Sequence, residues 1–334
     1  MATEDIVLYH YFYSPYARRI VWYLALRGIP YSQCLQPPMM PRPDLARLGI
    51  AYRRIPILSI GRDVYLDTRL QLRKLEELPW PAPKLASSKG DEQALERLLE
   101  SLAVDSGVFS TAAALLPTDL PLLQDPAFQK DRSDFTGVEF SAEGLQRARP
   151  ELLREFAGMF ELLETTLLAD GRDWVLKTEG PGLADIEAVW PVHWMVGIPG
   201  ALPVKQFSPA VYPKVYAWIK RFNDAVVAAK KNMAEPRTLS GEEAAELITK
   251  SAFHDAQGSV DAEDFVVEAQ GLKNGDVVTV SPTDTGASKK DAGRLVSMDK
   301  NEVVFETKAE GGSVRVHAPR HGFRVRMRGT SAVL

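Results

Sequence analysis

The spacing of hydrophobic positions changes twice along the chain. Residues 6–78 alternate short apolar runs with helical patterns, in the order β-α-β-α-β-β-α. Residues 91–231 carry apolar side chains three and four positions apart, which is typical of amphipathic helices. Residues 264–328 alternate apolar and polar positions and predict a small all-β module of five or six strands. The pattern thus predicts an α/β part, an all-α part and an all-β part.

The individual elements follow from the same spacing. In the first part we expect strands over 6–9, 31–36, 57–60 and 63–66, and helices over 15–26, 43–48 and 68–78. In the second part we expect helices over 92–116, 145–168, 183–196 and 211–231.

Two breaks separate these parts. The first is the run from Leu78 to Pro83, where alternate prolines disfavour a helix and predict an extended linker. The second, softer break lies between about Asn232 and Asp264 and contains a capping box at Ser240, which predicts a helix from Gly241 to Lys250. We therefore expect domains over 1–80, 90–232 and 263–330, with a helical linker over 233–262.

Composition and charge narrow the class of protein. The chain has 334 residues, of which 45% are hydrophobic and 25% charged, as in an ordinary soluble protein of two or three domains. Its net charge of −4 gives no reason to expect nucleic acid or an anionic membrane as the partner of the whole chain.

Nothing in the sequence indicates a metal site, an internal disulfide or a membrane span. The single cysteine, Cys34, excludes an internal disulfide, and the five histidines show no metal-ligand spacing, so we expect no metal. No apolar run reaches the roughly 18 residues that a membrane span needs. The acidic start, Met1 to Asp5, is not typical of a signal peptide, and we expect a cytoplasmic protein.

A serine opens the first predicted helix. In Ser14-Pro15-Tyr16, serine is a favoured N-cap and proline a favoured first helical residue, so capping alone explains the motif. The same position has a second reading, because a hydroxyl beside free backbone N–H groups at the positive end of the helix dipole would stabilise the thiolate of a bound thiol.

Two further motifs flank the predicted hairpin. Pro56 enters a strand after Ile55, and a cis bond there would present the Ile55 backbone to a bound peptide, whereas a plain strand-start proline is the alternative. Asp67 and Thr68 stand where a strand ends and a helix begins, which is again typical of capping. A carboxylate beside a hydroxyl and helix N–H groups could also hold the ammonium and carboxylate of an amino acid.

Together, the order and spacing of these motifs resemble the glutathione S-transferase superfamily. The family pattern is a strand, a catalytic residue at the first helix, then V/I-P-x-L, then an acidic or amide residue followed by Ser or Thr; here these positions are Ser14, Ile55 to Leu58, and Asp67-Thr68. The serine placement is similar to that of the theta and zeta types, and the omega type would have cysteine at Ser14. Residues 180–186 resemble the family's capping box, with Gly182 in place of Ser or Thr.

The resemblance, which covers about residues 6–231, implies a thioredoxin-like domain, an all-helical domain and a dimer. It also implies that glutathione is held by Arg54, Ile55, Pro56, Asp67 and Thr68, with its thiolate stabilised by Ser14. Two departures touch this site: residues 49–54 replace the usual Asn-Pro-x-Gly segment, and Asp67 replaces the commoner Glu or Gln.

Several other side chains are candidates around this site. Tyr13 and Tyr16 flank Ser14 and are auxiliary candidates, while Tyr9 lies nearer to the position of the catalytic residue in tyrosine-type members. Asp105 interrupts the apolar face of the first helix in the helical domain and is a buried cap, a subunit contact or part of the acceptor pocket. Phe109 is a second pocket candidate, with core packing as the alternative.

The C-terminal β module lies outside the resemblance. Between Gly311 and Gly329 it carries five arginines and no acid, which suggests RNA or another polyanion, but residues 255–310 hold 12 acids and only 6 Lys or Arg. A strand whose solvated face carries arginine explains the pattern equally well, so nucleic acid is not the favoured partner. We expect the module to pack on the helical domain, shaping a substrate entrance or an oligomer contact.

The sequence thus predicts a glutathione S-transferase-like enzyme that activates the glutathione thiolate for attack on a small apolar electrophile. Conjugation, isomerisation and ether or halide displacement stay open. The alternative is a non-catalytic member of the fold that serves as a binding or assembly module.

Overall fold

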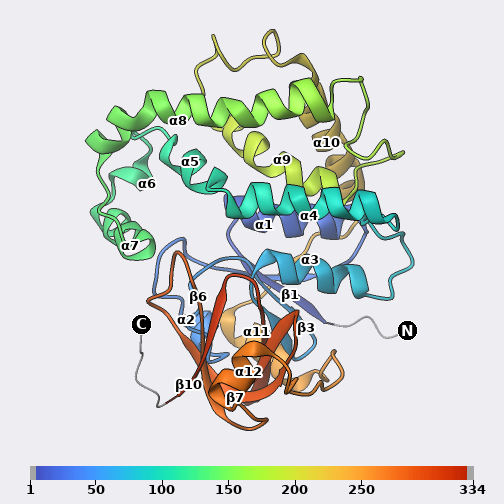
Figure 1. Cartoon of the computed structure of the whole chain (residues 1–334), viewed down its shortest axis with the longest axis vertical. Helices are drawn as coiled ribbons and strands as arrows, with labels where there is room; N and C mark the ends of the chain where they lie inside the picture. The colour runs from blue at the N-terminus through green and yellow to red at the C-terminus, as the bar shows by residue number, and fades with distance from the viewer. Residues whose placement is uncertain (1–4, 329–334) are drawn as a thin grey trace.

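The structure is a computed structural model that describes residues 5–328. Helices form two layers above a long sheet, and the C-terminal strands, orange to red in Figure 1, lie at the opposite end of the molecule from α8. The strands are β1 (Ile6–His10), β2 (Ser32–Leu35), β3 (Ile57–Ile60), β4 (Asp63–Tyr65), β5 (Arg237–Thr238), β6 (Val277–Pro282), β7 (Asp291–Met298), β8 (Glu302–Ala309), β9 (Gly312–Pro319) and β10 (Phe323–Met327).

The helices cover both faces of this sheet and build the upper part of the molecule. They are α1 (Pro15–Leu26), α2 (Pro43–Ala46), α3 (Thr68–Glu77), α4 (Gly90–Asp105), α5 (Val108–Ala114), α6 (Pro121–Gln124), α7 (Pro126–Thr136), α8 (Ala142–Leu162), α9 (Leu183–Val196), α10 (Pro213–Lys231), α11 (Gly241–Lys250) and α12 (Phe265–Gln270), with a π-helical turn η1 over Leu163–Leu167. No helix within residues 5–328 has the length and apolar character of a membrane span.

The fold class is as predicted: a thioredoxin-like domain, a helical domain and a C-terminal all-β region. In the first domain β1 pairs in parallel with β2 and antiparallel with β3, and β3 continues into β4. One apolar core lies between this sheet, α1, α3 and the helical domain, with Trp190 and Trp218 at its centre. The predicted reach of Asp185 back to the Gly182 N–H is present at 3.0 Å, at the start of α9.

The C-terminal module joins the thioredoxin-like sheet directly. Strand β9 pairs in parallel with β4, with Asp63 opposite Arg315, so one ten-stranded sheet runs in the order β10-β6-β7-β8-β9-β4-β3-β1-β2-β5. A second apolar core fills the space between the far face of the first domain, α11 and the module. The expectation that the module packs mainly on the helical domain was wrong, because the free edge of β4 and the apolar face beside it take up the module instead.

Four other local predictions differ from the structure. The helix expected over 92–116 breaks at Gly107, whose φ of +85° is left-handed, so α4 and α5 are separate. The helix expected over 145–168 ends its regular part at Leu162 and continues as η1. Residues 265–270 form α12 rather than a strand because Asp264 caps the N–H groups of Val266 and Val267. Helix α7 was missed since it buries a single side chain, Phe128, and so has no apolar stripe.

Candidate functional site

A cavity of about 420 Å³ lies where the three parts of the chain meet. The first domain, the helical segments α4, α5 and α7, and two loops of the C-terminal module each contribute to its wall. Of the ten residues proposed from the sequence, the structure places nine in this wall: Ser14, Tyr16, Arg54, Ile55, Pro56, Asp67, Thr68, Asp105 and Phe109. Tyr13 is outside it, with 49% of the residue exposed and its ring 4.7 Å from that of Tyr11.

Ser14 is the N-cap of α1 and faces the cavity. Its hydroxyl accepts the Ala17 N–H at 3.2 Å, and the residue is only 2% exposed. A hydroxyl that accepts one hydrogen bond still has its own hydrogen to donate. The capping role is therefore present, and it leaves the second reading, a donor to a bound thiolate, chemically available.

The Ile55–Pro56 bond is cis, which was one of the two alternatives. The Pro56 carbonyl accepts a hydrogen bond at 2.9 Å from the side-chain amide of Gln71, which also donates to the Tyr65 carbonyl at 2.9 Å. Sequence reasoning missed Gln71, although an amide on the apolar face of a predicted helix is a signal, because a fully buried polar group needs a partner.

Asp67 and Thr68 start α3 with an unusual backbone. Asp67 has a φ of 65°, uncommon for a residue with a side chain, and its carboxylate accepts the Arg69 N–H at 3.0 Å. The Thr68 hydroxyl accepts from Arg19, which is fully buried and also pairs with Glu187 of α9. Burial raises the pKa of Glu187 to about 7, although the neighbouring Arg19 guanidinium acts to lower this pKa. This buried pair ties the wall of the cavity to the helical domain.

The unusual segment 49–54 is the contact surface for the module and for α7. The Asp291 carboxylate of β7 accepts the N–H groups of Ala51 at 2.6 Å and Tyr52 at 3.3 Å. Arg53 pairs with Asp131 and Asp134 of α7. Where the family pattern has Asn-Pro-x-Gly, this chain therefore carries groups that bind the C-terminal module and α7.

Arg54 faces the cavity but is already engaged. Its guanidinium pairs with Asp284 and donates to the Thr285 carbonyl at 2.6 Å, both in the loop between β6 and β7. The loop thus forms one wall of the cavity, and the role of the module in shaping a substrate entrance stays a prediction.

The helical side of the cavity combines aromatic and charged groups. Phe109 lies 5.1 Å from Tyr16 and stacks on Trp194 at 5.8 Å between ring centroids. Asp105 pairs with Arg69 and lies 3.3 Å from the Nε2 atom of His321, which comes from the loop after β9. Burial raises the pKa of Tyr16, so its hydroxyl stays protonated and able to donate.

Arg42 is a further cavity residue that the sequence did not reveal. It is 5% exposed, and its guanidinium donates to the backbone carbonyls of Pro37, Pro38 and Arg53. Burial lowers its pKa to about 10, which leaves it charged at neutral pH. Within residues 5–328 no carboxylate lies within ion-pair distance of it, so backbone carbonyls alone hydrogen-bond this buried cation.

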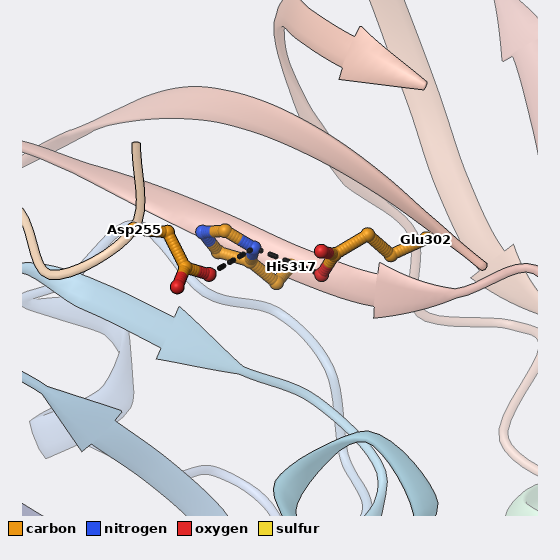
Figure 2. A group of neighbouring side chains, drawn as sticks. All are labelled: Asp255, Glu302 and His317. Atoms are coloured by element: carbon orange, nitrogen blue, oxygen red, sulfur yellow. Dashed lines mark hydrogen bonds and ion pairs between the residues drawn. The ribbon is translucent and has the colours of Figure 1, made fainter. Parts of the chain in front are cut away.

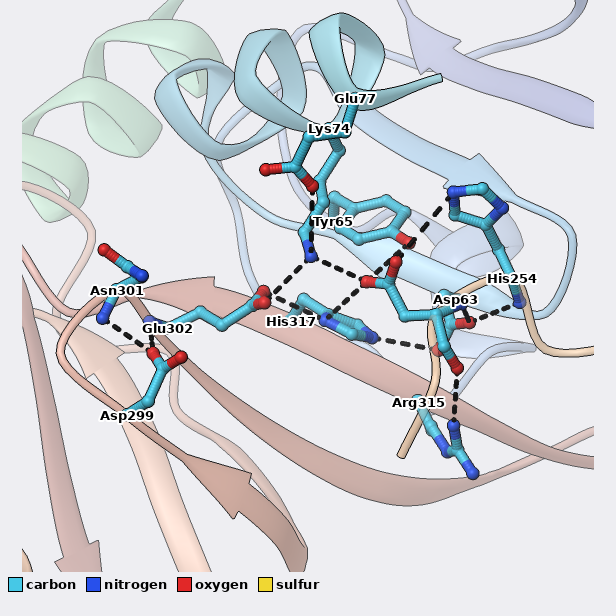
Figure 3. A network of polar contacts seen from close by, with 11 residues as sticks. Asp63, Tyr65, Lys74, Glu77, His254, Asp299, Asn301, Glu302, Arg315 and His317 are labelled. Atoms are coloured by element: carbon cyan, nitrogen blue, oxygen red, sulfur yellow. Dashed lines mark hydrogen bonds and ion pairs between the residues drawn. The ribbon is translucent and has the colours of Figure 1, made fainter. Parts of the chain in front are cut away.

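A separate polar cluster lies where β4 meets β9. We call Asp63, Lys74, Asp255, Glu302 and His317 the seam cluster. Figure 3 shows how Asp63, Lys74, Glu302 and His317 converge, and Figure 2 shows Asp255 beside His317. The His317 ring donates or accepts at both nitrogens, with Nε2 2.9 Å from Asp63 and Nδ1 3.1 Å from Glu302. Lys74 Nζ lies 2.7 Å from Asp255 and 2.8 Å from Glu302.

Three residues of the seam cluster are of types that bind metal ions. One ligand atom each from Asp255, Glu302 and His317 lies within 4.8 Å of the others (Figure 2). The Lys74 ammonium already bridges the two carboxylates, so a metal ion would have to displace it. The chain's own cations balance these acids, and the cluster works as an ion-pair network between the module and the first domain.

Comparisons with known proteins bear on the fold. Residues 13–78 match the family model described as glutathione S-transferase, N-terminal domain, and residues 111–231 match a domain of unknown function, DUF7962. No curated protein matches the sequence.

Among solved structures, a GST-like protein from Pseudomonas syringae aligns with a TM-score of 0.67 and 25% identity, over 97% of this chain and 100% of that one. A beta-etherase from Sphingobium sp. aligns with a TM-score of 0.53 and 17% identity, over 68% of this chain and 99% of that one, and shows a similar fold. The chain therefore has the glutathione S-transferase fold, and residues 13–78 match the N-terminal domain of that family. Because 97% of the chain is covered, the likeness to the Pseudomonas protein includes the C-terminal strands.

Proposed function

We propose that the protein is a glutathione-dependent transferase whose active site is the 420 Å³ cavity. The observation that carries the proposal is that Ser14, at the N-terminus of α1, shares this cavity with Ile55, Asp67 and Thr68. These are the groups that the resemblance assigns to thiolate stabilisation and to glutathione binding.

In this proposal the peptide backbone of glutathione pairs with Ile55, and its ammonium lies against the Asp67 carboxylate. A carboxylate of glutathione pairs with Arg42, whose buried guanidinium donates to backbone carbonyls and forms no ion pair within residues 5–328. We assign this role to Arg42 rather than to Arg54, since Arg54 already pairs with Asp284.

The chemical step rests on the start of α1. The Ser14 hydroxyl donates to the glutathione sulfur, and the helix dipole adds to the stabilisation, so the thiol loses its proton at a lower pH. The thiolate then forms a carbon–sulfur bond with an electrophile that lies against Val104, Phe109 and Phe135. In a substitution, the electron pair displaced at the electrophile departs with the leaving group. In an addition, it stays on the product and takes up a proton.

A non-catalytic role is the second candidate, and one observation favours it. Three of the proposed ligand groups already have partners within the chain: Arg54 with Asp284, Thr68 with Arg19, and Asp105 with Arg69. A cavity whose polar groups bind one another needs no ligand to satisfy them.

Calorimetric titration with glutathione separates the two candidates. We expect binding by the unchanged chain, at least tenfold weaker binding by Asp67→Asn, and a raised pKa of the bound thiol in Ser14→Ala, read from thiolate absorbance. Each variant has a matched control with the same substitution at the N-cap of another helix: Ser141→Ala at α8 and Asp125→Asn at α7. If millimolar glutathione gives neither heat nor a thermal shift, the non-catalytic role is favoured.

A further inference from the structure

The outer surface of the C-terminal module has a small hollow of its own. It measures about 160 Å³ and lies between β6, β10 and the loop that joins β6 to β7. Its wall contains three cationic side chains, Lys290, Arg324 and Arg326, together with hydroxyl residues and small side chains: Thr279, Ser281, Pro282, Thr283 and Ala287.

Strand register brings the cations and hydroxyls together. In the antiparallel pair β6–β10, Arg324 lies opposite Ser281 and Arg326 lies opposite Thr279. Residues opposite each other in such a pair point to the same face of the sheet. The hydroxyls of Thr279 and Thr283 donate to backbone carbonyls, so Ser281 is the one that can turn toward a ligand.

Four arginines of the module fall into two groups. Arg320 pairs with Asp264, and Arg315 lies 3.9 Å above the Phe253 ring and donates to the Asp255 carbonyl. Arg324 and Arg326 are exposed, and within residues 5–328 neither they nor Lys290 form an ion pair. The described wall of the hollow contains no acidic side chain.

Protection of a sheet edge explains part of this pattern. Strand β10 is the edge of the ten-stranded sheet, and charged side chains on an edge strand discourage pairing with other chains. Such protection does not require a third cation from a separate loop, and it does not require a hollow lined by a hydroxyl. The concentration of one sign of charge in a chain of net charge −4 calls for a further explanation.

We propose that this hollow is a binding site for a phosphate group. Guanidinium groups pair with the oxygens of a phosphate through two parallel hydrogen bonds, and a lysine ammonium adds a point charge. Three cations and the Ser281 hydroxyl match a compact dianion with several acceptor oxygens. The phosphate belongs to a small phosphorylated molecule, because a hollow of about 160 Å³ has room for only one or two phosphate groups.

The site lies next to the proposed active site but does not depend on it. Thr283 is part of both walls, and the following residues Asp284 and Thr285 are held by Arg54 at the larger cavity. A phosphate in the hollow would therefore contact the outer side of the loop whose inner side lines the 420 Å³ cavity. The inference stands whether or not glutathione binds.

The test uses the full chain and sodium pyrophosphate as the probe, titrated by calorimetry in 50 mM and 200 mM salt. We expect binding that weakens with salt and that falls by about tenfold or more in the double variant Arg324→Gln/Arg326→Gln. The matched control is Arg294→Gln, an exposed arginine on the neighbouring strand β7 that is outside the hollow; it should bind pyrophosphate as the unchanged chain does.

Circular dichroism and urea unfolding of the double variant check that its fold is intact. The proposal is overturned if pyrophosphate does not bind at millimolar concentration, or if Arg294→Gln weakens binding as much as the double variant. A third result would also overturn it: binding of a single-stranded RNA 20-mer without binding of pyrophosphate, which would indicate a diffuse polyanion surface.

Discussion

Two of the polar regions where the C-terminal module contacts the rest of the chain differ in burial. In the seam cluster, Asp63 is fully buried and His317 is 2% exposed. At the 420 Å³ cavity the contacts are more open: the side chains of Asp284 and His321 are 64% and 66% exposed. Buried pairs lose much free energy when one partner is removed, whereas exposed pairs contribute about 0–1 kcal/mol. We infer that the seam holds the module in place, and that the contacts at the cavity are free to adjust to a ligand.

The largest expected effect is at the buried acid of the seam. Asp63 accepts hydrogen bonds from the backbone of His254 at 2.7 Å and Asp255 at 2.9 Å, besides its bond to His317. Asp63→Ala leaves these donors without an acceptor, so we expect the free energy of unfolding in urea to fall by about 3–5 kcal/mol. The control, Asp284→Ala at the cavity, should change it by less than about 1 kcal/mol. Equal losses in the two variants would contradict the difference between the two regions.

A glycine that packs against the far end of β8 gives the next largest effect. Gly49 has a φ of +71°, and a Cβ there would lie 2.2 Å from the Lys308 carbonyl oxygen of β8. For Gly49→Ala we expect a loss of about 3 kcal/mol, because a backbone clash adds to the cost of the left-handed conformation.

Gly137→Ala is its matched control. Gly137 has a similar φ of +74°, but no atom lies within 4 Å of the added Cβ. It should lose about 1–2 kcal/mol from the conformation alone. If both variants lose the same amount, the close approach of the module to Gly49 contributes nothing.

The seam should also make stability depend on pH. The carboxylates of Asp63 and Glu302 raise the pKa of His317 above its usual 6.5, despite burial. The stabilisation from the charged ring is therefore complete below pH 6.5 and is lost as pH rises through the higher pKa of the folded state. His317 and Lys74 lower the pKa of Glu302 to about 2, so its contribution is present above pH 4.5 and is lost as pH falls toward 2.

Urea unfolding from pH 3 to 9 measures this dependence. We expect the highest contribution of the seam between about pH 4.5 and 6.5. The variant His317→Gln should lose the decline on the alkaline side, while His321→Gln, an exposed histidine at the cavity, should keep it. An unchanged alkaline decline in His317→Gln would show that another group causes it.

Local patterns were sufficient for most of the first domain. The apolar spacing and the capping residues predicted β1, α1 and α3, and the motifs at Ser14, Ile55 and Asp67 led to residues of one cavity. These features depend on neighbours in sequence, through helix caps and the side-chain period.

The features that were missed depend on distant contacts. Strand β9 pairs with β4 across about 250 residues, and an alternating strand pattern does not specify its partner. Arg42 gave no signal in the sequence, since a surface arginine and a buried one look the same until the fold places carbonyls around the guanidinium.

The smallest expected change in stability is at Arg54, where it should be accompanied by a change in binding. Its side chain is 22% exposed and its partner Asp284 is largely in solvent, so Arg54→Gln should lower the free energy of unfolding by about 1 kcal/mol or less. The loop over Thr283 to Thr285 would then lose its attachment to the first domain, and the entrance of the cavity would open. We therefore expect Arg54→Gln to change glutathione affinity more than stability. The control is Arg47→Gln, which removes another exposed ion pair between the first domain and the module. It should change neither glutathione affinity nor stability by much. A large loss of stability in Arg54→Gln would place Arg54 with the seam rather than with the adjustable wall of the cavity.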